Sequence, residues 1–174
     1  MAYPSPGGRL VFHVFAALAI VELQAHQAKA QRKAMRRLLL RGQERIHFKK
    51  ESDARRGQIW SEIERWTPSI KVHVVTSSHR YQSEARGECL TELTRLAPRV
   101  SANLVVIERD EGSETGDRDT LTRGLRGTGI SWELQPPRAD ALLWVADAAA
   151  WLWTHPQRRW RDRVDPYVEH VIRL

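Results

Sequence analysis

Residues 141–153 have the sequence Ala-Leu-Leu-Trp-Val-Ala-Asp-Ala-Ala-Ala-Trp-Leu-Trp, an apolar segment long enough for about three helical turns. Its single charged side chain is Asp147, at the centre. A lone carboxylate among apolar side chains is unfavourable by several kcal/mol unless it is hydrogen-bonded, ion-paired or bound to a cation. The segment therefore predicts a buried helix in which Asp147 binds a metal ion or pairs with a buried Arg. A third interpretation is that the helix begins at Asp147 itself.

Outside this segment, strand patterns alternate with helix patterns. Residues 102–108, Ala-Asn-Leu-Val-Val-Ile-Glu, predict a fully buried strand, and further strands are expected over 10–21, 70–76 and 130–135. Amphipathic spacing predicts helices between these strands, over about 22–40, 53–66 and 81–96. This alternation predicts an α/β fold with a mostly parallel central sheet flanked by helices.

The chain is strongly basic. Its 174 residues fit a single domain, 1–174, in which residues 157–174 form a basic C-terminal tail that packs back on the domain. Lys and Arg number 28 against 21 Asp and Glu, a net charge of +7, which favours a polyanionic partner such as nucleic acid. Five cations lie on one side of the helix expected over 22–40, where they either contact phosphates or form a solvated face: Lys29, Arg32, Lys33, Arg36 and Arg37.

The single cysteine, Cys89, excludes a disulfide within the chain, and a reducing cytoplasm fits it best. The apolar run over residues 10–23 is too short to span a bilayer and lacks the features of a signal peptide, so no membrane association is expected. A protein partner or a homo-oligomer stays open.

Two acids are candidate ligands for Mg²⁺ or Mn²⁺, which prefer oxygen donors. Glu108 ends the buried strand, where functional groups of α/β sheets gather, and Asp147 lies on the helix expected beside it. Asp110 follows Glu108 by two residues, and the alternative is that the acids from Asp110 to Asp119 simply solvate a loop. His47 precedes Glu51 by four residues, which on a helix would place both on one face, for a metal or general-base role or for a structural one.

Three stretches resemble a known family. Arg45-Ile-His-Phe-Lys-Lys-Glu51, the strand ending in Glu108, and Leu143-Trp-Val-Ala-Asp147 are similar to an uncharacterised family of ribonuclease H-like proteins. Members open on an Asp-Glu-Ser signature and carry a final helix of the form Leu-Gln-x-Ala-Asp, where this chain has Trp144 in place of Gln. The resemblance implies a ribonuclease H-like fold, a metal-binding acidic centre and a nuclease-like activity.

The chain departs from that family at its start. Residues 1–21 contain no Asp or Glu, and residues 3–8 stand where the signature would fall. Either the first strand is missing or a central metal ligand has been lost. Two functions therefore stay open. One is an Mg²⁺- or Mn²⁺-dependent nuclease that uses Glu108, Asp147, Asp110 and His47; the other is a non-catalytic module that binds nucleic acid or a protein through the basic helix.

Overall fold

Six strands form one mixed sheet. The computed structural model describes residues 8–14 and 17–174, with side chains from residue 18 onward. The sheet has the order β5-β4-β1-β2-β3-β6. Its strands are β1 (Gly8–Val14), β2 (Ala17–Gln24), β3 (Ile70–Thr76), β4 (Ala102–Glu108), β5 (Ser131–Gln135) and β6 (Val168–Arg173).

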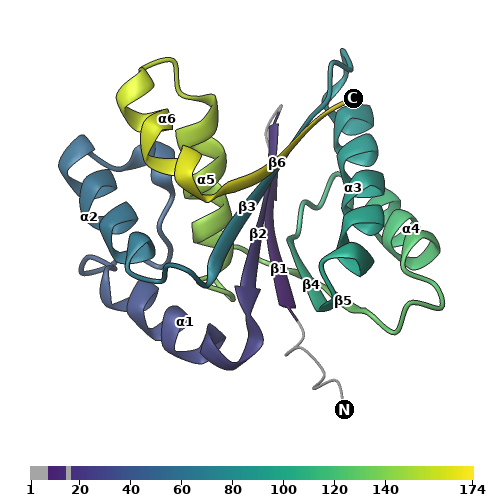
Figure 1. Ribbon diagram of the computed structural model, residues 1–174, viewed down its shortest axis with the longest axis horizontal. Helices are drawn as coiled ribbons and strands as arrows, with labels where there is room; N and C mark the ends of the chain where they lie inside the picture. The colour runs from purple at the N-terminus through teal and green to yellow at the C-terminus, as the bar shows by residue number, and fades with distance from the viewer. Residues whose placement is uncertain (1–7, 15–16) are drawn as a thin grey trace.

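Helices cover both faces of this sheet. Figure 1 shows α1, α2, α5 and α6 on one side, and α3 and α4 on the other. Their bounds are α1 (Ala28–Arg37), α2 (Asp53–Glu64), α3 (Gln82–Arg99), α4 (Glu114–Gly124), α5 (Leu143–Thr154) and α6 (Arg158–Val164), with short 3₁₀ turns η1 (Ala25–Gln27), η2 (Phe48–Lys50) and η3 (Asp165–Tyr167). None of the described helices combines the length and the apolar character needed to cross a membrane.

The expected single strand over 10–21 is wrong, because the structure divides this run into β1 and β2. The two strands pair antiparallel, with Val14 opposite Leu18, so the chain reverses between them. The run of twelve apolar-rich residues is about twice the length of an average strand, and a short connection permits only antiparallel pairing. β1 precedes β2 at the centre of the sheet, beside β4, and its sequence contains no Asp or Glu.

The sheet is less parallel than expected. β1 pairs parallel to β4, β4 to β5, and β3 to β6, but β2 runs antiparallel to both of its neighbours. The alternation of strands with helices misled the prediction at β2 and β3. The helices α1 and α2 between those strands return the chain to the same end of the sheet instead of crossing it.

Two hydrophobic cores lie on the two faces of the sheet. Leu90 and Leu93 of α3 pack against Val105 and Ile107 of β4 in the smaller core. In the larger core, α5 is enclosed by the sheet and by α1, α2 and α6, and every residue from Leu143 to Ala150 is buried. The buried helix predicted from residues 141–153 is therefore confirmed, and it carries Asp147 into the protein interior.

Candidate functional site

Asp147 lies inside the protein and is held by the segment before α2. It is 6% exposed and is the fifth residue of α5, so the interpretation that it starts the helix is wrong. Its Oδ2 atom accepts the backbone N–H of Phe48 at 2.9 Å and lies 3.4 Å from Nδ1 of His47. A backbone amide and an imidazole therefore provide polar contacts for this buried carboxylate.

The segment that carries His47 is fastened by α2. Arg56 donates from Nε to the carbonyl of Phe48 at 3.0 Å, and Phe48 itself is fully buried. His47 has extended backbone angles directly before η2, so it does not share a helical face with Glu51 as expected. Glu51 instead accepts from Gln43 at 2.6 Å. The helical spacing failed because η2 ends after a single turn.

Glu108 meets the same segment from the sheet. It is the last residue of β4, and its carboxylate lies 3.7 Å from NH1 of Arg45. Its backbone carbonyl accepts from NH2 of Arg86 at 3.1 Å. Arg45 and His47 are two residues apart, so one short segment contacts both Glu108 and Asp147. The structure thus places the two predicted ligands around a common loop.

Asp110 points into its own turn. Its carboxylate accepts the N–H of Gly112 at 3.2 Å and the hydroxyl of Ser113 at 3.1 Å, immediately before α4. The loop interpretation fits Asp110 and Glu111, which are exposed, but not Glu114, Asp117 and Asp119, which lie in α4. Asp117 lies within α4, is 3% exposed and forms an ion pair of 2.7 Å with Arg86.

The described side chains do not fit the metal centre that the resemblance implies. Two-metal hydrolysis relies on clustered ligands that hold ions about 3.5–4 Å apart. Among side chains 18–174, no three His, Cys, Asp or Glu residues converge closely enough to hold a metal ion. Arg45 also places a positive charge beside Glu108, and N–H groups contact Asp147.

A cavity of about 250 Å³ opens beside Asp147. Trp151 and Thr154 of α5 and the adjoining His155 line it, together with Lys49 of η2. These residues were missed in the sequence, although Asp147, Trp151 and His155 recur every four residues, a spacing that places side chains on one face of a helix. Arg45 was also missed, because nothing near it in the sequence indicates its contact with Glu108.

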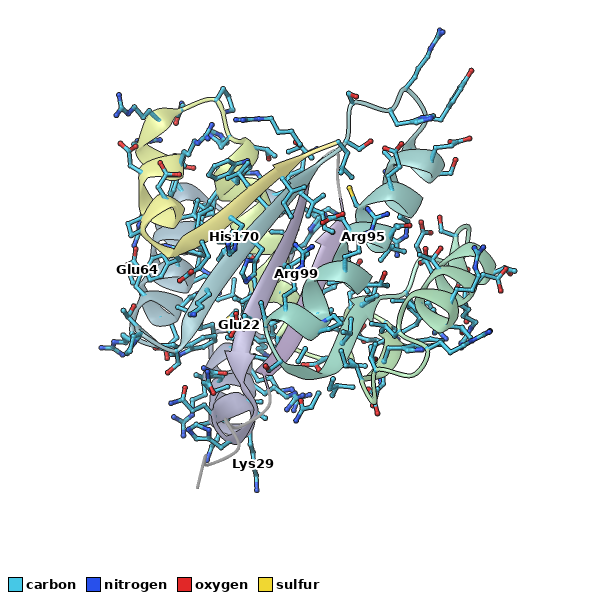
Figure 2. All side chains as sticks on the ribbon, turned by 45° about the vertical axis from the view of Figure 1, so that its right-hand side comes forward. Glu22, Lys29, Glu64, Arg95, Arg99 and His170 are labelled. Atoms are coloured by element: carbon cyan, nitrogen blue, oxygen red, sulfur yellow. The ribbon has the colours of Figure 1, made fainter. Side chains whose placement is uncertain are left out.

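The outer face of α1 presents the predicted cations. Lys29, Lys33, Arg36 and Arg37 are exposed, and Lys29 projects away from the protein in Figure 2. Arg32 is different, because it forms a two-pronged pair with the buried Asp140, at 2.9 and 3.1 Å, and so fastens α1 to the start of α5. Arg36 donates to the carbonyl of Ala139 at 3.2 Å. A shallow groove of about 420 Å³ runs between the five side chains.

No protein-family model and no curated protein matches this chain. Among solved structures, a chain of the PCNA:RNase HII complex from Archaeoglobus fulgidus is similar, with a TM-score of 0.53 and 16% sequence identity. The match covers 92% of this chain and 75% of that one. At this identity the similarity concerns the fold alone. The protein described here therefore has a ribonuclease H-like fold.

Proposed function

We propose that this protein binds nucleic acid with the outer face of α1. The observation that carries the proposal is the set of exposed cations on that face. Within residues 18–174, no carboxylate lies within ion-pair distance of Lys29, Lys33 or Arg37, whereas Arg32 is held by Asp140. These three are left available for an external anion.

Their spacing suits a phosphate backbone. Lys29, Lys33 and Arg37 follow one another at intervals of four residues, about one helical turn, so the three side chains form a row along α1. Each phosphate that a cation neutralises releases condensed counterions, which supplies most of the affinity of sequence-independent binding. The row therefore favours contacts with the backbone over readout of bases.

The test compares two variants that lose the same charge. Lys29→Ser/Lys33→Ser/Arg37→Ser removes the row, and Arg80→Ser/Arg99→Ser/Arg126→Ser removes three exposed cations elsewhere. Arg99 lies on α3, well apart from Lys29 in Figure 2. Fluorescence anisotropy with labelled single-stranded and duplex oligonucleotides at low salt should show weaker binding for the first variant only. Equal losses of affinity in the two variants would show that binding depends on net charge alone. Absence of binding by the wild type would contradict the proposal.

Cleavage of the bound strand is a second candidate function. One observation favours it: His47 lies 3.4 Å from the Asp147 carboxylate, which can orient the imidazole as a general base, and Asp147 lines a cavity. Labelled DNA, RNA and hybrid substrates should be incubated with Mg²⁺, Mn²⁺ or EDTA. Activity that disappears in Asp147→Asn and His47→Ala supports a nuclease. Activity that EDTA abolishes would show that cleavage depends on Mg²⁺ or Mn²⁺. Absence of activity in every condition would leave nucleic-acid binding as the proposed function.

A further inference from the structure

We propose that the cavity beside Asp147 binds a single nucleotide, with its base against Trp151 and His155 and its phosphate near Lys49. The inference deepens the proposed function and rests on it. It assigns a substrate class, a single-stranded nucleotide, to a cavity that lies apart from the basic face of α1.

The size of the cavity sets the first limit. Drug-sized ligands occupy pockets of roughly 300–1,000 Å³. At about 250 Å³, this cavity is just below that range, so it suits one ring system and not a stacked pair of bases. A base within a duplex is stacked on both faces and cannot enter. The site therefore selects an unpaired nucleotide.

The aromatic wall is fixed in place. The Trp151 ring has Phe48 edge-on at 5.4 Å and Trp160 edge-on at 5.6 Å, measured between ring centroids. The guanidinium of Arg56 lies 4.4 Å from its centre. His155 packs 4.2 Å away at a tilt of 36°. Because Arg56 lies over the Trp151 ring and His155 packs against it, a base that enters the cavity stacks on the imidazole of His155 and contacts the indole beside it.

Two residues of opposite charge, Asp147 and Lys49, line the cavity. Asp147 supplies a carboxylate to the wall, and carboxylate oxygens have about four acceptor sites, which suit the N–H edge of a base. Lys49 is exposed and supplies a cation near the same opening. A nucleotide combines N–H donors on a flat ring with an anionic phosphate, so it complements this arrangement as a whole.

The cavity and the basic face are reached from different parts of α5. Arg32 and Asp140 join α1 to the start of α5, whereas Thr154, which lines the cavity, ends that helix.

The test blocks the cavity without changing charge. Thr154→Phe places a ring at the exposed rim, and Thr122→Phe, at an exposed position of α4, is the control. Circular dichroism first confirms that both fold. Lys49→Ser is a second variant that needs no repacking. The probes are a single-stranded octanucleotide, the matching duplex and free mononucleotides, followed by anisotropy and calorimetry.

We expect Thr154→Phe to weaken single-strand binding about thirtyfold, the middle of the range for loss of one stacked base, and to leave duplex binding unchanged. Lys49→Ser should weaken single-strand binding more than duplex binding. Mononucleotide binding that Thr154→Phe abolishes supports a site for the free nucleotide, and an effect confined to the octanucleotide supports a site for a strand. Equal single-strand affinities for the Thr154 and Thr122 variants would overturn the inference. The Lys29→Ser/Lys33→Ser/Arg37→Ser variant should bind both the single strand and the duplex more weakly than the wild type. If it binds both as the wild type does, the role of α1 is contradicted, whereas the comparison of the Thr154 and Thr122 variants still tests the cavity.

Discussion

The carboxylate of Asp147 accepts the backbone N–H of Phe48 at 2.9 Å, and this hydrogen bond joins the central helix to the segment that also contacts Glu108. Phe48 is fully buried and Asp147 nearly so. The bond therefore satisfies a donor that water does not reach, and it holds Asp147 beside His47. This relationship makes Asp147 part of the fold as well as part of the candidate site.

Replacing Asp147 with Ala should destabilise the protein more than replacing it with Asn. The Asn side chain keeps an oxygen that can accept the Phe48 N–H, whereas Ala leaves that donor buried and unsatisfied, at about 1–3 kcal/mol. Urea denaturation of both variants measures the difference in the free energy of unfolding. Equal stabilities would mean that the Phe48 N–H finds another acceptor.

Asp117→Ala should be strongly destabilising. Arg86 and Asp117 pair at 2.7 Å with side chains that are 8% and 4% exposed, so the variant leaves a buried guanidinium without its counter-charge, at about 3–5 kcal/mol. Glu114→Ala in the same helix breaks an exposed pair with Arg118 and should cost about 1 kcal/mol or less. Thermal and urea unfolding of the two variants provide the comparison, and similar losses would refute a special role for the buried pair.

Two glycines of α4 should respond to alanine in opposite directions. A Cβ atom at Gly124 would overlap the side chain of Thr94 on α3, whereas one at Gly116 would meet open space. Gly116→Ala should stabilise the helix by about 0.5–1 kcal/mol, because alanine has less conformational freedom to lose on folding. At Gly124 the overlap should outweigh that gain, since overpacking costs about 1–3 kcal/mol. Stabilisation by both substitutions would show that α3 and α4 can move apart.

Cys89 should be unreactive in the folded protein. Burial, and secondarily the charge of Glu88, raises the pKa of its thiol from about 9 to about 11. The unfolded chain loses this proton first, so the contribution of the thiol to stability is complete below about pH 9 and declines as the pH rises to about 11. Comparing wild type with Cys89→Ala across this range isolates the effect. A difference in stability that is independent of pH would contradict the raised pKa.

Local sequence patterns were sufficient to predict the elements that consist mainly of buried apolar residues. The apolar run around Asp147 predicted α5, because a segment buried on all sides needs no partner to be recognised. Residues 102–108 predicted β4, although the strand is not fully buried as expected: Asn103 is exposed and Leu104 is half-buried. The hairpin of β1 and β2 was missed because both strands are apolar, so no change of pattern marks the reversal.

The candidate site was only partly predictable. Burial of Asp147 followed from its neighbours in the sequence, but its contact with the Phe48 N–H did not, since a backbone donor has no signature of its own. The contact of Arg45 with Glu108 and the pair of Arg86 with Asp117 join distant segments, and a single sequence carries no record of such pairings. The cations of α1 were found by their spacing, whereas the role of Arg32 in holding Asp140 needed the structure.

The salt dependence of binding tests the central claim most directly. The logarithm of the association constant of wild type and of Lys29→Ser/Lys33→Ser/Arg37→Ser should be measured against the logarithm of the salt concentration, with one oligonucleotide. Each phosphate contact contributes about 0.7 to the slope for single strands and about 0.9 for duplex DNA, so loss of three contacts should flatten the slope by about 2–3. An unchanged slope in the variant would contradict nucleic-acid binding through α1.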